Sequence, residues 1–387
     1  MIDFEVPEES RLLVDTVKRF IEKELAPLEQ KVEDSGTVDP DLVRDLRRKS
    51  CELGLFAMTY PRDVGGGGLG TIDSCLVEEQ CGWTSDALVR RAFGAIPGPI
   101  IHCQGEQRER YLLPAVRGEI DVGLGMTEPA AGSDAAAIRT TAKRDGKDWI
   151  INGTKHFITD GDFVDTVIIS AVTDPEKGTK GISTFFVDKG TPGFRVARVQ
   201  HMMGMRGVNH AELSLEDVRV GPEQLLGEEG AGLSQMLSFV NAYRLGGVGA
   251  RAVGMASRVL ALATDYARQR KQFGKPIGEF QMIQEKLADM VTDIFGVRMM
   301  VLNTAWEIDQ GRDPREKVSM VKFHASEMLG RVVDRGVQIF GGMGYTKEFI
   351  MERLYRDARV LRIYDGTTEI HKMVIARSLM KNGVPAL

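Results

Sequence analysis

The spacing of apolar residues changes twice along this chain, and that change limits the folds that it can adopt. In the first part apolar residues recur at helical intervals, as Leu13 and Val17 do. In the middle part short apolar stretches alternate with turn residues, and Asn152-Gly153 predicts a hairpin. Later, long helical patterns return and continue to the end. The sequence therefore predicts an α+β multidomain protein with an N-terminal α-helical domain (1–120), a middle β-barrel or β-sandwich domain (121–229) and a C-terminal helical bundle domain (230–387).

Composition allows several domains and excludes some classes of function. At 387 residues the chain exceeds the usual size of a single hydrophobic core. Its net charge of −5 is modest and the two signs are interspersed, so we expect no nucleic-acid partner. No apolar run reaches the roughly 20 residues that span a bilayer, and no leader sequence is visible, so we expect no membrane partner and a cytoplasmic, bacterial protein. The histidines and cysteines lack ligand spacing, which predicts no metal site.

Two motifs in the middle part bring polar groups to points of close approach. The Thr127-Glu-Pro turn precedes Gly132 and Ser133, and the residue before proline must be extended or turned. Further on, strand alternation places Phe157 and Thr159 on one face, an aromatic surface beside a hydroxyl that suits a flat heterocycle. Each motif also has a purely structural interpretation, as a strand-to-loop turn and as a core aromatic residue.

Two further motifs lie in the C-terminal part. Arg270 and Phe273 belong to a basic helix end closed by glycine and proline, where the Arg270 guanidinium is suited to hold a diphosphate. Gln338 precedes a glycine cluster that begins with Gly341 and Gly342 and lets a backbone or a ligand approach closely. The structural alternatives are cations that favour a helix dipole and a glycine C-cap, although a C-cap explains only one glycine.

Near the end of the chain a carboxylate, a glycine and two hydroxyls lie between two helical stretches. As structure alone, Asp365-Gly366 is a turn dipeptide, Thr367 or Thr368 can cap the last helix, and Glu369 favours the helix dipole. As chemistry, the same segment offers a carboxylate for proton transfer.

Together these motifs resemble, in order, the signatures of the acyl-CoA dehydrogenase family of flavoenzymes. The likeness extends from about Glu8 to Arg377 and includes the family's Thr-Glu-Pro-x-x-Gly-Ser-Asp, Ile-Thr-Asn-Gly, Arg-Lys-x-Phe-Gly, Gly-Gly-x-Gly-Tyr and Ile-Tyr-Glu-Gly-Thr patterns. The resemblance implies an N-terminal α-domain, a middle β-barrel and a C-terminal four-helix bundle, usually in homotetramers. It also implies FAD bound between the β-domain and the bundle, with its ADP half held by a neighbouring subunit.

The resemblance implies two sets of FAD contacts. The first set, at the edge or face of the flavin, is Met126, Thr127, Gly132, Ser133, Phe157 and Thr159. The second set, across the subunit interface or on the phosphate side, is Arg270, Phe273, Gln338, Gly341, Gly342, Thr367 and Glu369. The family usually has tryptophan where Phe157 stands, and phenylalanine keeps the aromatic face but loses the indole donor.

The resemblance further implies an acyl-CoA thioester as substrate and an electron-transfer flavoprotein as electron acceptor. The expected substrate contacts are Ser133, Asn241, Arg244, Tyr364 and Gly366. Arg244 resembles the arginine of the family's Asp-x-x-Arg segment, which meets the CoA nucleotide. However, Asn241 replaces the carboxylate, and the spacing from Arg244 to Gly254 is one residue longer than expected.

In the implied reaction Asp365 takes the α-proton of the thioester while a β-hydride passes to flavin N5, leaving a trans-2-enoyl-CoA. A flavin ribityl hydroxyl and the backbone N–H of Asp365 would stabilise enolate character at the carbonyl oxygen. Most of the family has glutamate here, and aspartate sets the carboxylate back by about 1.5 Å. The extra room favours bulkier, branched or cyclic acyl groups.

Two alternatives stay open at this stage. The nearest is a flavin oxidase of the same fold, acting on acyl-CoA or on nitroalkanes, and the other is a non-catalytic scaffold in which Asp365 is only a turn residue. Arg90 and Arg91 depart from the family pattern, and we interpret them as part of a solvated helix face.

Overall fold

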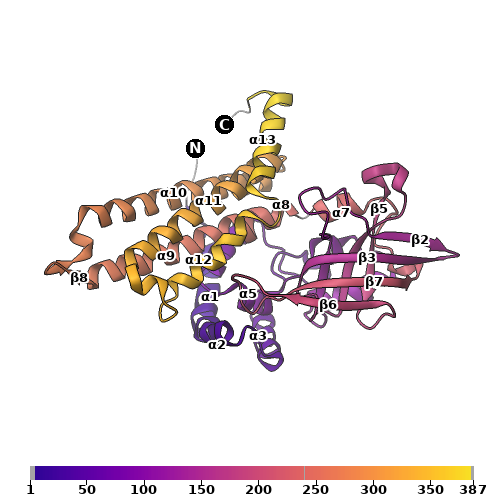
Figure 1. Ribbon diagram of the computed structural model, residues 1–387, viewed down its shortest axis with the longest axis horizontal. Coiled ribbons are helices and arrows are strands. Elements are labelled where there is room, and N and C mark those ends of the chain that lie inside the picture. The colour runs from indigo at the N-terminus through magenta and orange to yellow at the C-terminus, as the bar shows by residue number, and fades with distance from the viewer. Residues whose placement is uncertain (1–4, 239, 385–387) are drawn as a thin grey trace.

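The structure, a computed structural model, describes residues 5–238 and 240–384 and has three parts along the chain. Figure 1 shows the N-terminal helices against one side of a long helical bundle, with a β-domain beside them. This order confirms the predicted fold class, with an N-terminal helical part, a middle β half-barrel and a C-terminal helical part.

The N-terminal part is built from α1 Glu8–Phe20, α2 Glu29–Ser35, α3 Pro40–Glu52, α4 Thr71–Cys81, α5 Asp86–Phe93 and α6 Leu113–Val116. Apolar side chains at helical spacing, including Val17, Leu46 and Leu88, meet in one buried core. Side chains before two of the helices fix where they begin. Asp39 accepts two N–H groups of the first turn of α3, and Ser85 accepts one N–H group of α5.

The β-domain is one seven-stranded sheet of β1 Val122–Gly125, β2 Thr141–Asp145, β3 Asp148–Thr159, β4 Thr166–Val172, β5 Ile182–Asp188, β6 Phe194–Gln200 and β7 His210–Val220. The strand order is β1-β4-β2-β3-β7-β6, and β5 pairs with β4. Neighbouring strands are antiparallel except where β4 lies beside β1 and β2. Trp149, Ile151 and Phe185 belong to the core of this domain.

The hairpin predicted at Asn152-Gly153 is wrong, because β3 continues through both residues. The turn lies earlier, at Gly146 between β2 and β3. Asn152 instead exchanges two hydrogen bonds with Asp217 of β7, at 3.0 and 2.8 Å. Gly153 is needed for a close approach, since a Cβ at this position would lie 2.4 Å from Thr140 Oγ1.

The C-terminal part consists of α7 Gly232–Ser238, α8 Val240–Tyr243, α9 Arg251–Gln269, α10 Gln281–Asp309, α11 Arg315–Phe340, α12 Met351–Arg359 and α13 Thr368–Asn382. The long helices α9, α10 and α11 pack around a core that includes Val259, Val301 and Leu329. A short hairpin of β8 Lys271–Gln272 and β9 Lys275–Pro276 joins α9 to α10 and projects from the end of the bundle (Figure 1).

A π-helical turn, Arg244–Ala250, joins α8 to α9. A π turn holds one residue more than an α-helical turn, so it accounts for the one-residue excess between Arg244 and Gly254. Gly247 lies in this turn against the ring of Tyr243, and a Cβ there would lie 2.5 Å from that ring. The same turn sets where Arg244 emerges from the helix.

Among the described residues, one helical run, Gly232–Gln269, has the length and apolar composition of a membrane span. Most of its most apolar 18-residue window is buried against the rest of the protein, and the run contains helices α7, α8 and α9 of the bundle. A central helix of a bundle has the same properties.

Candidate functional site

The loop that carries Asp365 reverses the chain between α12 and α13. Asp365 has a φ of 53° and Gly366 a φ of 95°, both in the left-handed region. A Cβ on Gly366 would lie 2.8 Å from His371 Nε2, so only glycine fits there. Thr367 then caps α13, and its hydroxyl accepts the N–H of Ile370 at 3.3 Å. Of the two possible caps, Thr367 is therefore the one used.

Three side chains hold the carbonyl groups of this loop. Arg244 Nε donates to the carbonyl oxygen of Asp365 at 2.7 Å, and His371 Nε2 lies 3.1 Å from the same atom. Lys322 Nζ donates to the carbonyl oxygen of Gly366 at 2.5 Å. Lys322 and His371 are fully buried. We call Arg244, Lys322 and His371 the carbonyl cradle, because they hold the loop through its backbone carbonyl groups.

The reactive groups of the loop stay free. Within the part of the chain that the structure describes, neither the carboxyl of Asp365 nor the N–H groups of Asp365 and Gly366 have a hydrogen-bond partner. In a trans peptide the N–H of Gly366 points away from the carbonyl of Asp365, and therefore away from the cradle. Asp365 is partly exposed. The loop thus offers an accessible carboxylate beside free N–H donors.

Burial and nearby charge act in opposite directions on Asp365. Burial raises the pKa of its carboxyl, whereas the positive charges of Arg244, Lys322 and Arg90 lower that pKa. Burial also lowers the pKa of Lys322 to about 8 and that of His371 to about 4. The imidazole of His371 is therefore neutral near pH 7, and its Nε2–H tautomer donates to the carbonyl of Asp365. A carboxylate with a raised pKa is suited to general-base catalysis.

The interpretation of Arg90 and Arg91 as a solvated helix face is wrong. Arg91 is only 7% exposed, and its two terminal nitrogens bind both carboxylate oxygens of Asp160, at 3.0 and 2.6 Å. Arg90 Nε reaches the same carboxylate at 3.3 Å. These bonds tie α5 to the residue that follows β3. The neighbours of both arginines in α5 are apolar and buried, and two charges on such a helix require partners.

The loop after β1 is held by buried polar groups. Lys155 is fully buried and pairs with Glu128 at 2.8 Å, and its Nζ also contacts the carbonyl oxygen of Met126 at 3.2 Å. The N–H of His156 donates to the carbonyl of Thr127 at 2.8 Å. Two backbone N–H groups after residue 138 also bind Glu128, at 2.6 and 3.0 Å. Sequence reasoning missed this ion pair, which fixes the loop expected to edge the flavin.

The residues expected to face the flavin are accessible. Gly132 and Ser133 are exposed, and Thr159 is partly exposed. Phe157 has a φ of 57° in a β-bulge, and half of its side chain is exposed. In a regular strand Phe157 would point to the same side as the buried Lys155. The bulge instead turns the ring of Phe157 out of the core. An exposed ring beside a hydroxyl and open backbone fits a flat heterocyclic cofactor such as FAD.

The second expected FAD set lies elsewhere. Arg270, Gln338, Gly341 and Gly342 are exposed, and Phe273 is 94% exposed on the β8–β9 hairpin. A Cβ on either of the two glycines would meet no atom within 4 Å. In Figure 1 this hairpin projects from the end of the molecule opposite the β-domain. Thr367 and Glu369 of this set lie instead at the start of α13, beside the Asp365 loop. One chain therefore does not bring the hairpin residues Arg270 and Phe273 to the flavin set, as expected for a cofactor shared between subunits.

The expected substrate residues lie around the base loop. Arg244 Nη1 contacts Asn241 Oδ1 at 3.2 Å, while its Nε is used by the loop carbonyl. The ring of Tyr364 lies 6.4 Å from that of Tyr243. Gly366 and Tyr364 are partly exposed. The expected contact of Arg244 with the CoA nucleotide stays a prediction, and its hydrogen bond to the loop was missed because it joins residues far apart in sequence.

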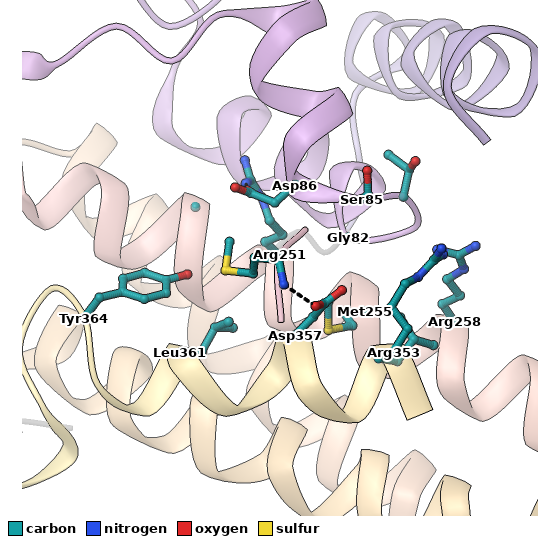
Figure 2. Close-up of a pocket in the computed structure, with 14 residues that line it drawn as sticks. Gly82, Ser85, Asp86, Arg251, Met255, Arg258, Arg353, Asp357, Leu361 and Tyr364 are labelled. Atoms are coloured by element: carbon teal, nitrogen blue, oxygen red, sulfur yellow. Dashed lines mark hydrogen bonds and ion pairs between the residues drawn. The ribbon is translucent and has the colours of Figure 1, made fainter. Parts of the chain in front are cut away.

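A pocket of about 520 Å³, including space open to solvent, lies between the α4–α5 turn, α9 and α12. Figure 2 shows Tyr364 at one end, with Asp86, Arg251 and Asp357 along its walls. Arg251 forms ion pairs with Glu78 and Asp86. Asp357 accepts the N–H of the β6–β7 loop at residue 205, and burial raises its pKa to about 6. Internal pairing occupies these charges, so we assign this pocket no ligand.

Comparison with known protein families matches all three parts of the chain. The families are acyl-CoA dehydrogenase, N-terminal domain (7–119), acyl-CoA dehydrogenase, middle domain (123–218), and acyl-CoA dehydrogenase, C-terminal domain (230–380).

Individual relatives match over nearly their whole length. Cyclohex-1-ene-1-carbonyl-CoA dehydrogenase of Geobacter metallireducens is 39% identical over 96% of this chain and 98% of its own. The caffeyl-CoA reductase-Etf complex subunit CarC of Acetobacterium woodii is 36% identical over 97% and 99%. The solved structure of butyryl-CoA dehydrogenase from Megasphaera elsdenii has a TM-score of 0.90 and 34% identity, and the match covers 98% of this chain and 100% of that one.

Proposed function

Since this chain belongs to the acyl-CoA dehydrogenase family of FAD-dependent oxidoreductases, we propose that it removes hydrogen from the α,β bond of an acyl-CoA thioester, with Asp365 as general base. The product is the trans-2-enoyl-CoA. FAD, when bound, supplies the acceptor for the hydride that leaves the β-carbon. The residues of this chain then have to place the thioester, take the α-proton and stabilise charge at the carbonyl oxygen.

The observation that carries this proposal is the free carboxyl of Asp365 above the carbonyl cradle. The helix from Asn241 to Gly247 contains no acidic residue, so it offers no alternative base. The raised pKa of Asp365 suits proton abstraction near neutral pH. The free N–H of Asp365 is a donor for the thioester carbonyl, where negative charge develops during proton transfer.

The cofactor contacts that we propose are the two sets named from the sequence. Phe157 and Thr159, with Met126, Thr127, Gly132 and Ser133, line the flavin end. The second set, Arg270, Phe273, Gln338, Gly341, Gly342, Thr367 and Glu369, belongs to the adenosine and phosphate end. Because the β8–β9 hairpin and the β-domain lie at opposite ends of one chain, we infer a homo-oligomer, in keeping with the expected homotetramer, in which neighbouring copies complete each FAD site.

The proposed electron acceptor is an electron-transfer flavoprotein, in a cytoplasmic setting. The name of the Acetobacterium woodii relative includes an Etf complex, which supports this partner. We also propose that branched or cyclic acyl groups are accepted. The shorter aspartate leaves room beside the α-carbon, and the Geobacter metallireducens relative is named for a cyclic thioester.

The test is anaerobic bleaching of the bound flavin by straight-chain, branched and cyclic acyl-CoA thioesters. We expect bleaching by at least one class and a loss of about 10²–10⁴ in rate for Asp365→Asn, with FAD still bound, because a general base has been removed. Asp357→Asn is the matched control. It removes a buried carboxylate from the pocket of Figure 2 but keeps an oxygen acceptor for the β6–β7 loop.

Three results would contradict parts of this proposal. Unchanged bleaching by Asp365→Asn would place the base elsewhere. Rapid reoxidation of the reduced flavin by air, in place of transfer to an electron-transfer flavoprotein, would identify an oxidase of the same fold. A clear preference for straight-chain thioesters would exclude the proposed preference for bulky acyl groups.

A further inference from the structure

Arg244 uses two of its three guanidinium nitrogens inside the chain. Its Nε donates to the carbonyl oxygen of Asp365 at 2.7 Å, and its Nη1 donates to Asn241 Oδ1 at 3.2 Å. Its Nη2 lies over Gly366, since a Cβ on that glycine would be 3.4 Å away from it. A guanidinium holds a phosphate best through two parallel N–H donors. Each paired edge of Arg244 includes a nitrogen that already donates, so the side chain is not arranged to grip the phosphates of a CoA nucleotide.

The backbone that Arg244 holds has an unusual conformation. Asp365 has a φ of 53°, in the left-handed region, which is unfavourable for a residue with a side chain. Such a conformation persists only where the surrounding groups fix it. The charged donor of Arg244 binds the carbonyl of this same residue, and a hydrogen bond from a charged group is stronger than one between neutral groups. Loss of this bond would therefore let the loop relax and change the direction of the Asp365 carboxylate.

Asn241 fixes the direction of Arg244 without neutralising its charge. The amide oxygen of Asn241 accepts a hydrogen bond from Nη1, and an amide carries no charge. Among the described residues, no carboxylate forms an ion pair with Arg244. The carboxylate of Asp365 belongs to the residue whose carbonyl oxygen Arg244 binds, so the two charges lie close together. The positive charge of Arg244 accordingly lowers the pKa of the Asp365 carboxyl against the effect of burial.

We propose that Arg244 is a positioning residue for the base Asp365, that Asn241 acts through it, and that Arg244 does not bind the CoA nucleotide. This inference rests on the proposed function, because it assigns a role around the proposed base. It differs from the nucleotide contact expected from the sequence. Arg244 sets the direction of the carboxylate through the loop carbonyl, and Asn241 keeps the guanidinium in the place where it can do so.

The test uses two thioesters of the same acyl group on the FAD-loaded enzyme under anaerobic conditions. One is the acyl-CoA, and the other is the acyl-pantetheine thioester, which lacks the nucleotide. A nucleotide contact acts only on the acyl-CoA, whereas the position of the base affects both. For Arg244→Gln we expect kcat for flavin bleaching to fall about 10²-fold with both thioesters, as a displacement of about 1 Å at the reacting group produces. The ratio of kcat/KM between the two thioesters should stay unchanged.

A conservative variant and a control make this result specific. Arg244→Lys keeps a charged donor for one carbonyl but not the planar fork, so we expect it to recover part of the lost rate. Arg298→Gln is the matched control. Arg298 is a partly buried arginine of α10 that donates to Glu79 at 2.8 Å, away from the base loop, and both thioesters should react as with the unmodified enzyme.

Two variants of Asn241 separate position from charge. Asn241→Asp keeps an oxygen acceptor but opposes the charge of Arg244, so the pKa of Asp365 rises. The acid limb of the pH–rate profile should then move to higher pH, with a rate up to about tenfold lower on that limb. Asn241→Ala removes the acceptor but no charge, so we expect kcat to fall about threefold to tenfold with the acid limb in place. Both variants leave unchanged the other titratable or charged groups around Asp365, which are Lys322 of α11, His371 of α13, Arg90 of α5, Tyr243 and Tyr364.

The outcomes separate this inference from the proposed function. If Arg244→Gln slows the acyl-CoA at least tenfold more than the acyl-pantetheine, or leaves kcat unchanged with both, the role proposed for Arg244 is wrong while the dehydrogenase proposal stands. If Arg244→Gln does not fold, or the acyl-pantetheine reacts too slowly to measure, the pH profiles of the two Asn241 variants with acyl-CoA decide, and an unmoved acid limb in Asn241→Asp overturns the inference. If no acyl-CoA bleaches the flavin of the unmodified enzyme, the proposed function itself fails.

Discussion

Two fully buried lysines, one in the β-domain and one in the bundle, hold the two loops on which the proposed chemistry depends. Lys155 of β3 contacts the carbonyl of Met126 in the loop expected to edge the flavin. Lys322 of α11 donates to the carbonyl of Gly366 in the base loop. Burial lowers the pKa of each ammonium to about 8. Each of the two loops is thus held by a buried lysine.

The two lysines differ in what balances their charge. Lys155 has its own carboxylate, Glu128 at 2.8 Å, and a further contact with Ser170 at 3.2 Å. Among the described residues Lys322 has no carboxylate within hydrogen-bonding distance, and the first charge that favours its protonated form is Asp365. Lys155, which has its own carboxylate partner, therefore stabilises the structure. Lys322 has no such partner, so its positive charge acts on the carboxylate of Asp365.

The largest effect that we expect is on stability, from Lys155→Met. The substitution leaves Glu128 buried without its cation, and breaking a buried ion pair costs about 3–5 kcal/mol. We expect the free energy of unfolding, measured in urea, to fall by about that amount and the FAD content to fall with it. The double variant with Glu128→Gln should recover part of the loss, since the unpaired charge is gone. A loss below about 1 kcal/mol would show that the pair contributes little.

The sequence predicts the fold and the candidate base, but not the groups that support them. The changes in apolar spacing are local, so they identify the three parts. The segment around Asp365 has a recognisable pattern within ten residues. The contacts of Arg244 and Lys322 with that segment join residues 121 and 44 positions apart. Nothing in either local pattern distinguishes these residues from ordinary helix cations.

Arg90 and Arg91 also show that a local sequence pattern does not reveal what packs against a helix. Charged residues at the end of a helix usually lie in solvent, so the local pattern favoured exposure. Whether a helix is enclosed depends on what packs against it, and here that is the end of β3 with Asp160. The useful signal was the apolar character of the other residues of α5. The surplus residue before Gly254 was visible in the sequence, but its π-helical turn was not.

The second prediction concerns the pH dependence of the reaction and uses Lys322→Met. Asp365 acts as a base only when ionised, so the bleaching rate rises with pH through its pKa. The charge of Lys322 lowers that pKa against the effect of burial, and its removal therefore raises the pKa of Asp365. The acid limb of the pH–rate profile should move to higher pH, with a rate about tenfold lower on that limb.

Lys155→Met is the matched control for this shift, because it removes the same charge from a site that is not coupled to Asp365. We expect its acid limb at the position of the unmodified enzyme, measured on the fraction that keeps FAD. No shift with Lys322→Met would mean that Lys322 acts on the loop only through its hydrogen bond to Gly366. An equal shift in both variants would mean that the shift does not come from the position of the Lys322 charge.

The smallest effect is expected from His371→Gln, which completes the comparison by testing an uncharged member of the cradle. Burial and the charges of Arg244 and Lys322 lower the pKa of His371 to about 4, so the imidazole has no charge to contribute above about pH 5. Glutamine keeps an N–H donor for the carbonyl of Asp365, and Arg244 keeps its bond at 2.7 Å. We expect kcat/KM to change by less than about fivefold, within the net value of one neutral hydrogen bond, and the acid limb to stay in place. A shift of the acid limb of the pH–rate profile would show that His371 is charged in the enzyme. The pKa of Asp365 would then be lowered by His371 as well as by Arg244, Lys322 and Arg90.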